Sequence, residues 1–228
     1  MNFKIFGLEN ELPIIRGVNC LCIENKSFYQ KFIYQLLNGE GEGNFCLVDD
    51  GIMVEDINKY FEIIVNPFSI KLDDKKLVNA FYKELSAQIV ADDEVYSEII
   101  NKVSEIQNLL ESVESDLDFE IETNENIADI LKYFNVSIKK EGNTLLDNLY
   151  QYIDLYSRWI KGNMLLFFNC LSFLDDNAIK ELHKYAKYHN ISIFFVEMNS
   201  VECRGINKLK IYDDFSDSLD LAVDDVIQ

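Results

Sequence analysis

Two continuous runs of apolar residues in the second half of the chain constrain its fold more than any other feature. They are MLLFF at residues 164–168 and ISIFFV at residues 191–196. Strands that are buried on both faces of a parallel sheet have this composition. Between the runs, apolar residues recur at helical spacing after Asp175 and Asp176, either of which can cap a helix. A strand, a helix and a strand in this order predict a right-handed parallel crossover.

The amino-terminal part of the chain shows the same alternation. Residues 18–23 predict a strand, and the helical pattern that follows ends at Gly39. Residues 45–48 and 62–65 predict two further strands. Towards the carboxyl terminus, residues 209–212 predict an edge strand. The last sixteen residues contain six aspartates and no basic residue, which favours a solvated tail or a weak helix.

The middle of the chain is different, because its apolar residues recur only at spacings of three and four. This pattern predicts successive helices, one of them roughly 30 Å long over about twenty residues. We therefore predict an α/β fold whose mostly parallel, P-loop-like sheet domain is formed by both chain ends, residues 1–73 and 152–228. Residues 74–151 are predicted to form an inserted all-helical domain that contains an acidic hinge.

Composition and charge exclude several classes of protein. The 228 residues include 21 basic and 40 acidic side chains, and apolar residues make up 48%, so the chain has a core and a net charge of −19. Such a charge opposes general binding to nucleic acid or membranes, so any anionic partner needs a local basic patch, a bound cation or a suitable assembly. Five cysteines without a CxxC pair indicate buried thiols in a reducing compartment rather than a zinc site. We expect a cytoplasmic protein with no signal peptide and no contact with a membrane.

A degraded phosphate-binding loop follows the first predicted strand. Lys26 and Ser27 stand where a P-loop places its lysine and its hydroxyl residue, but Cys20 and Asn25 replace the two glycines. A Cβ atom at these positions obstructs the approach of phosphate to the backbone. Asn169 replaces the aspartate that would hold magnesium after the later strand. The sequence thus favours a P-loop-like scaffold without nucleotide over an active nucleotide hydrolase.

The region between Lys102 and Lys132 contains nine carboxylates and no basic residue. Four of these carboxylates alternate with apolar residues: Asp116, Asp118, Glu120 and Glu122. In an extended chain, this alternation places the carboxylates on one face and Leu117, Phe119 and Ile121 on the other, as anchors. The carboxylates repel one another unless a cation neutralises them, and calcium tolerates irregular oxygen ligands. A solvated acidic face remains the alternative, and no nucleophile is visible nearby that would favour paired-carboxylate catalysis.

Lysines are the candidate phosphate contacts. The notable cluster is Lys132, Lys139 and Lys140, just after the acidic stretch. Other lysines group at Lys75 and Lys76 and at Lys180, Lys184 and Lys187, where a solvated face is the alternative. Lysine with almost no arginine suits contact with phosphate that does not depend on base sequence.

Three segments together carry a resemblance to a known family: ESDLDFEIE, ILKYFNVSI and LLFFNCLSFLDDNAIKELHKYAKYHNISIFFVE, within about residues 109–199. They resemble the short Csn-family adaptation protein of type II-A CRISPR systems, which accompanies the RNA-guided nuclease. The order of α/β, helical and α/β segments agrees with that family along the entire chain.

The resemblance implies a homotetrameric ring that is held together by calcium and binds double-stranded DNA, especially at free ends, without being an enzyme. It implies a role in CRISPR spacer acquisition beside the integrase subunits and the effector nuclease. It also implies calcium ligands at Asp116, Asp118, Glu120 and Glu122, with Glu114 and Glu125 as possible additions, and DNA-contacting lysines at Lys132, Lys139, Lys140 and Lys26. Two alternatives stay open, a divergent P-loop NTPase and a scaffold that binds only proteins.

Overall fold

The computed structural model describes residues 1–38, 45–54, 59–114, 119–121, 125–160, 164–200, 202 and 205–222. The chain divides into two compact units. The α/β unit comprises Met1–Ile70 and Glu141–Gln228, and the helical unit comprises Lys71–Lys140. The second boundary thus precedes helix α5 (Leu145–Trp159), whereas the sequence prediction placed it at residue 151, inside this helix.

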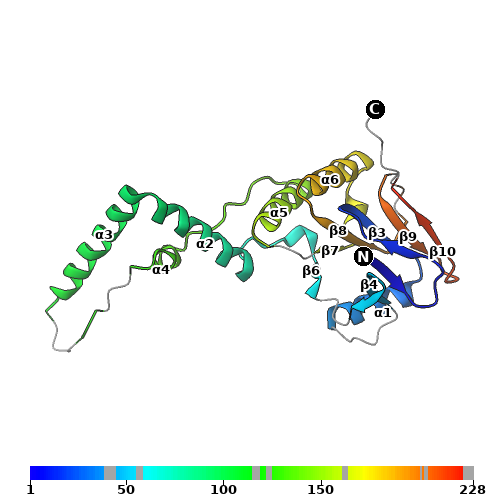
Figure 1. Cartoon of the computed structure of the whole chain (residues 1–228), viewed down its shortest axis with the longest axis horizontal. Helices are drawn as coiled ribbons and strands as arrows, with labels where there is room; N and C mark the ends of the chain where they lie inside the picture. Colours follow the sequence, from blue (N-terminus) through cyan, green and yellow to red (C-terminus); the bar gives the residue numbers. More distant parts are fainter. Residues whose placement is uncertain are drawn as a thin grey trace. The chain divides into compact units, whose positions relative to one another are not determined.

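A six-stranded sheet forms the centre of the α/β unit (Figure 1), with the strand order β10-β9-β3-β8-β7-β6. The strands are β3 (Gly17–Ile23), β6 (Phe61–Ile64), β7 (Met164–Phe168), β8 (Ser192–Glu197), β9 (Asn207–Ile211) and β10 (Asp217–Asp220). Five of these strands, β9, β3, β8, β7 and β6, run parallel to one another, and β10 at the edge is antiparallel to β9. The predicted α/β class with a mostly parallel sheet is confirmed.

The carboxyl-terminal part of this sheet corrects two predictions. Strand β9 is not an edge strand, because it lies between β3 and β10. The stretch predicted as a solvated tail contains strand β10, whose Leu219 pairs with Leu209 and packs against the core. Pairing through backbone groups explains the error, since a sheet can include an aspartate-rich segment on its edge without an apolar pattern.

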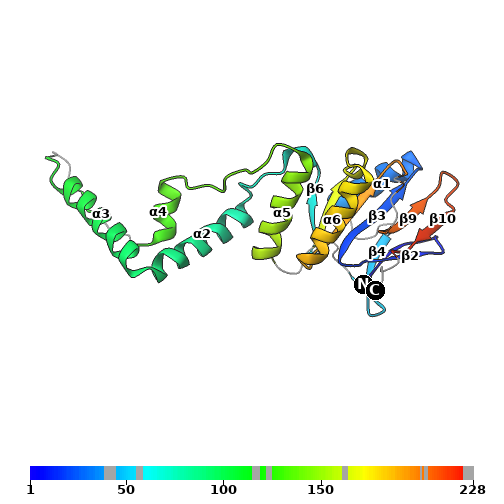
Figure 2. The same cartoon turned by 90° about the horizontal axis from the view of Figure 1, so that it is seen from above.

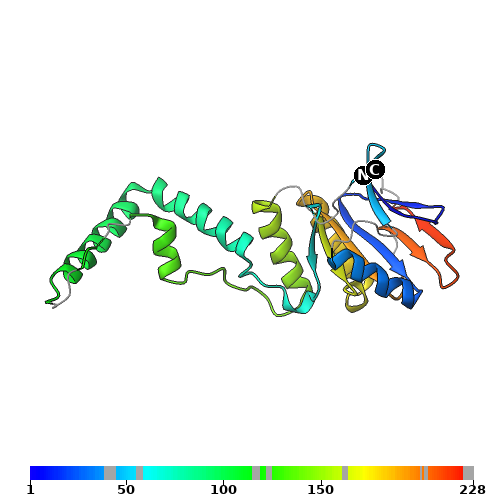
Figure 3. The same ribbon diagram turned by 90° about the horizontal axis from the view of Figure 1, so that it is seen from below.

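A second, antiparallel sheet, which the sequence analysis did not predict, has the order β2-β1-β4-β5. Its strands are β1 (Asn2–Ile5), β2 (Glu11–Pro13), β4 (Phe45–Asp49) and β5 (Ile52–Val54). Its Phe3 contributes to a core shared with helix α1 (Lys26–Asn38) and with the large sheet. The ring of Phe3 lies 5.9 Å from that of Phe32 in α1 and 5.0 Å from that of Phe194 in β8. This packing fixes α1 against the parallel strands (Figure 3).

Helices α5 and α6 (Asp176–Tyr188) cover the face of the large sheet opposite α1, as Figure 2 shows. Thr144 and Asp147 form a capping box at the start of α5, and the Asp175 side chain caps α6. Two short 3-10 helices, η2 (Pro67–Ser69) and η3 (Leu171–Phe173), complete the unit. The described cysteines are buried free thiols, as predicted, while Cys203 lies outside the described residues.

The helical unit consists of α2 (Lys75–Ala91), α3 (Asp93–Glu111) and α4 (Ile127–Tyr133) among its described residues. The Asp92 side chain caps α3 by accepting a hydrogen bond from the Val95 amide. A small core gathers around Tyr82, Ile127 and Leu131. In the part of the chain that the structure describes, no helix is both long and apolar enough to cross a membrane.

Candidate functional site

The carboxyl ends of β3, β7 and β8 mark the place where an open parallel sheet normally binds its ligand. Helix α1 begins directly beside this edge, and Lys26 and Ser27 are its first two residues. Both side chains are exposed. The predicted position of a P-loop-like lysine at the start of a helix is therefore present in the structure.

The connection between β3 and α1 is nevertheless too short for a phosphate cradle. Strand β3 extends to Ile23, so only Glu24 and Asn25 separate it from the helix, and Cys20 lies inside the strand. Glu24 is held on both sides, because its amide donates to the Ile211 carbonyl at 2.9 Å and its carboxylate pairs with Lys210 at 2.8 Å. A P-loop requires a longer glycine-rich loop whose amides face the phosphates.

The Asn25 side chain completes the closure of this connection. Its Oδ1 accepts a hydrogen bond from the Phe28 amide at 2.9 Å, which caps α1. Its Nδ2 donates to the carbonyl of Asp213 at 3.1 Å, in the turn between β9 and β10. In a P-loop, backbone amides at the start of the helix bind phosphate. Here the Phe28 amide already donates to Asn25, which argues against the NTPase alternative.

Replacing Asn25 with alanine is expected to lower the free energy of unfolding by roughly 1–2 kcal/mol, because the helix loses its cap and the turn loses its tether. Urea unfolding followed by circular dichroism measures the change. Asn38→Ala is the control, since among the described residues the Asn38 side chain bonds to the Tyr34 carbonyl alone, at the exposed end of α1. Equal stability of the Asn25 variant and the unsubstituted protein would contradict this role.

Polar contacts, exposed at Asn169 and buried at Glu197, close the next part of the same edge. The amide of Met198 donates to Asn169 Oδ1 at 3.1 Å, so this side chain ties the end of β7 to the segment after β8. Glu197 is 1% exposed, and its Oε1 accepts hydrogen bonds from the Cys170 and Leu171 amides at 2.7 and 2.9 Å. Burial raises the pKa of Glu197, and burial together with the Glu197 carboxylate raises the pKa of Tyr29 to about 12. This cluster was not predicted from the sequence, because Glu197 and its partners are far apart in the chain.

The structure describes residues 119–121 of the acidic stretch. Asp116, Asp118 and Glu122 lie outside the described residues, while Glu120 is described and exposed. Phe119, predicted as an anchor, is 50% exposed, so its ring is only half covered. No group of three metal-ligating side chains occurs among the residues that the structure describes.

Three of the candidate lysines lie in the helical unit and one lies in the α/β unit. Lys132, in α4, forms an ion pair with Asp129 at 2.8 Å, one turn earlier in the same helix. Lys139 and Lys140 are exposed in the irregular segment that follows α4. Since α4 ends at Tyr133, the three side chains do not share one helix face. Lys26 belongs to the α/β unit.

Helix α3 carries an exposed apolar face in its second half. The whole helix is described, and none of its residues is buried. Tyr96, Ile99 and Ile100, in its first half, pack against the core of the helical unit. The second half exposes Ile106 by 53%, Leu109 by 68%, Leu110 by 49% and, just beyond the helix, Val113 by 55%. We call these four residues the α3 apolar face; the helical pattern predicted that they share a side, but not that it is uncovered.

Comparison with known proteins places the chain in a family. Residues 40–214 match the family of the CRISPR-associated protein Cas_Csn2. CRISPR-associated protein Csn2 of Streptococcus agalactiae is 21% identical over 194 residues, covering 84% of this chain and 87% of the relative. CRISPR-associated protein Csn2 of Enterococcus faecalis is 22% identical over 208 residues, covering 90% and 92%.

A solved structure supports the fold. The crystal structure of Stu0660 of Streptococcus thermophilus superimposes with a TM-score of 0.54 at 13% sequence identity, covering 98% of this chain and 77% of the other. The match to the family model spans most of the sequence, from β4 to the turn after β9. The chain therefore belongs to the Csn2 family of CRISPR-associated proteins.

Proposed function

We propose that four copies of this chain form a calcium-assembled ring that binds double-stranded DNA, preferably at free ends, during CRISPR spacer acquisition. The protein acts without catalysis and without sequence preference in this proposal. Membership of a CRISPR-associated family supports the biological setting. The integrase subunits and the effector nuclease are the proposed protein partners.

The structural observation that carries the proposal is the α3 apolar face. Its four large aliphatic side chains are about half exposed or more, on a helix whose other face is polar. Contiguous exposed apolar surface of this kind marks an interaction site in a folded protein. In this proposal the α3 apolar face binds a second copy of the chain. Identical subunits related by two-fold symmetry contact each other through the same patch on both partners.

Calcium fits the chemistry of the acidic stretch, which adjoins the carboxyl end of α3. Asp116, Asp118, Glu120 and Glu122 offer only carboxylate oxygens, the donors that calcium prefers. Glu120 is exposed and so accessible to an ion. When bound, calcium supplies positive charge that offsets the repulsion among these carboxylates. In this proposal the four carboxylates bind the ion at the acidic hinge, and α3 presents its apolar face to the next subunit.

DNA binding must overcome a net charge of −19 per chain. Electrostatic interactions are screened over about 8 Å at physiological salt, so distant carboxylates matter little to DNA in a central opening. Exposed Lys139 and Lys140, together with Lys132 and Lys26, supply the positive charges in this proposal. Binding through such phosphate contacts is strongly salt-dependent and indifferent to sequence.

Replacing Lys139 and Lys140 with glutamate is expected to lower the affinity for a linear duplex by at least about tenfold, because each subunit loses two phosphate contacts and gains two repulsive charges. A gel shift with blunt duplex in calcium buffer measures the loss. The slope of affinity against salt concentration should also become shallower.

A charge-matched control comes from the same unit. Lys83 and Lys76 are exposed on α2, outside the candidate set, and their double substitution by glutamate changes the charge equally. If both double variants weaken binding to the same degree, the effect is one of net charge, and the assignment of Lys139 and Lys140 is wrong.

A further inference from the structure

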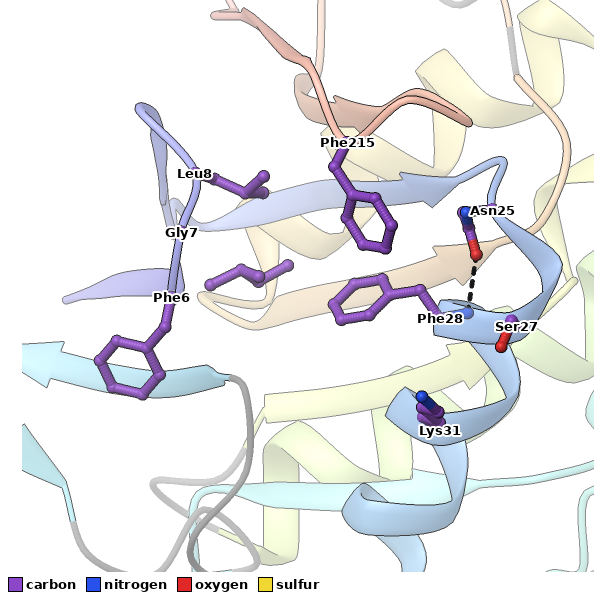
Figure 4. A pocket seen from close by; sticks show the side chains of 9 residues that line it. Phe6, Gly7, Leu8, Asn25, Ser27, Phe28, Lys31 and Phe215 are labelled. Carbon is purple, nitrogen blue, oxygen red and sulfur yellow. Dashed lines mark hydrogen bonds between the residues drawn. The ribbon is translucent and has the colours of Figure 1, made fainter.

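A pocket of about 440 Å³ opens on the α/β unit beside the first turn of α1 (Figure 4). Three segments line it: the turn after β1, the first turns of α1, and the turn between β9 and β10. Ile5, Leu8, Phe28 and Phe215 form its apolar walls, and Ser27 and Lys31 lie on its α1 side. The pocket is far larger than one aliphatic side chain and lies in the range of small-ligand sites.

Phe215 is held in this pocket at a conformational cost. Its φ of 64° lies in the left-handed region, which glycine and asparagine adopt readily and which costs a bulky residue about 1–2 kcal/mol. Hydrogen bonds fix the turn, because the Phe215 amide donates to the Tyr212 carbonyl and the Tyr212 amide donates to that of Ser216. Such strained positions concentrate at functional sites.

Burial of the ring does not explain why residue 215 is a phenylalanine despite its positive φ. The Phe215 ring contacts Phe28 edge to face, with ring centroids 5.5 Å apart, yet 51% of Phe215 remains exposed. A half-exposed aromatic ring on a rigid turn provides a surface on which another planar ring can stack. The aromatic wall therefore points to a planar aromatic ligand.

The polar residues of the pocket, Ser27 and Lys31, indicate which planar aromatic ligands it suits. Ser27 and Lys31 are one helical turn apart on α1, and both are exposed. Within the described part of the chain, neither side chain takes part in a hydrogen bond or an ion pair. An ammonium group and a hydroxyl group beside a stacking surface match a nucleotide, which joins a planar base to a phosphate. An apolar peptide side chain would leave both polar groups unused.

We propose that this pocket holds an unpaired nucleobase at the end of a DNA duplex, stacked on the half-exposed ring of Phe215, with its phosphate beside Lys31. The inference rests on the proposed function, because the ring brings DNA ends to the protein. A paired base keeps both faces stacked inside the duplex, so only a frayed or overhanging base can enter. Recognition by stacking is independent of base identity.

The test compares two 2-aminopurine-labelled duplexes of the same sequence, one blunt and one with a single-nucleotide overhang that carries the label. In calcium buffer at fixed salt, we expect at least about fivefold tighter binding of the overhang duplex. We also expect its fluorescence to increase, because the labelled base leaves the neighbouring base that quenches it. Phe215→Gly should abolish both the preference and the fluorescence increase while blunt-duplex binding stays unchanged. Lys31→Ala should reduce the preference.

The variants and controls distinguish a loss of the pocket's function from a loss of folding or of DNA binding in general. Glycine suits the positive φ at residue 215, so the relief of strain offsets the lost contact with Phe28, and thermal melting should confirm a folded protein. Phe173→Ala removes an exposed phenylalanine of η3 outside the pocket and should change nothing in DNA binding. An overhang preference that is absent, or that survives Phe215→Gly, overturns the inference alone. Failure to bind either duplex overturns the proposed function as well.

Discussion

Substituting Leu109 and Leu110 with glutamate is expected to convert the assembled protein into smaller species, down to single chains. Both residues belong to the α3 apolar face and are exposed within one chain, so the substitution leaves the fold intact. In an interface between subunits, the same change would bury two charges without partners, at a cost of several kcal/mol per contact. Light scattering coupled to size-exclusion chromatography in calcium buffer measures the mass.

The control for this substitution is Ile52→Glu. Ile52 lies on β5 in the α/β unit and is 72% exposed, close to the 68% of Leu109. The control should keep the mass of the unsubstituted protein, and circular dichroism should show the same helix content in all three proteins. If the Leu109 and Leu110 variant keeps its full mass, α3 is not the assembly surface.

Removing the Glu197 carboxylate is expected to have the largest effect on the stability of the fold. Glu197→Ala leaves the Cys170 and Leu171 amides without their acceptor at a buried site. The expected loss in the free energy of unfolding is roughly 2–5 kcal/mol. Chemical denaturation at pH 5 measures it, and Glu202→Ala, an exposed site in the same unit, serves as the control. A loss below about 1 kcal/mol would show that the buried bonds contribute little.

Glu197→Gln should change the dependence of stability on pH. Burial raises the pKa of Glu197 above its unfolded value, so the folded state binds the proton more tightly than the unfolded chain. The stability due to the protonated group is complete below the unfolded pKa and is lost as the pH rises through the folded pKa. The glutamine variant keeps Oε1, which accepts both amide bonds, but does not titrate. Its stability relative to the unsubstituted protein should therefore increase with pH over that window, and a constant difference would contradict the shift.

The elements with strong side-chain patterns could be predicted from the sequence. Strands β3, β7 and β8 are buried on both faces and have continuous apolar runs, while α2 to α6 show clear helical spacing and useful caps such as Asp92 and Asp175. The missed strands are short or polar. Strand β10 reads Asp-Ser-Leu-Asp, and its place in the sheet depends on backbone pairing with β9, which side-chain composition does not encode.

The candidate sites could be predicted only where their chemistry is local in sequence. The sequence shows directly that both P-loop glycines are replaced. Only the structure shows that Asn25 bonds to the carbonyl of Asp213, 188 residues later. The contacts of Glu197 with Cys170 and Leu171 span more than twenty residues. Helices α2 and α4 cover only part of α3, and this leaves the α3 apolar face exposed. The spacing of apolar residues within α3 does not reveal how far that cover extends.

A gel shift that compares one duplex in linear form and as a covalently closed circle tests the central claim most directly. A closed ring of subunits can take up DNA only over a free end, and the proposed assembly requires calcium. The account predicts that the linear duplex is retarded with calcium, that a chelator abolishes the retardation, and that the closed circle is not retarded. Equal retardation of the circle, or an unbound linear duplex with calcium present, would contradict it.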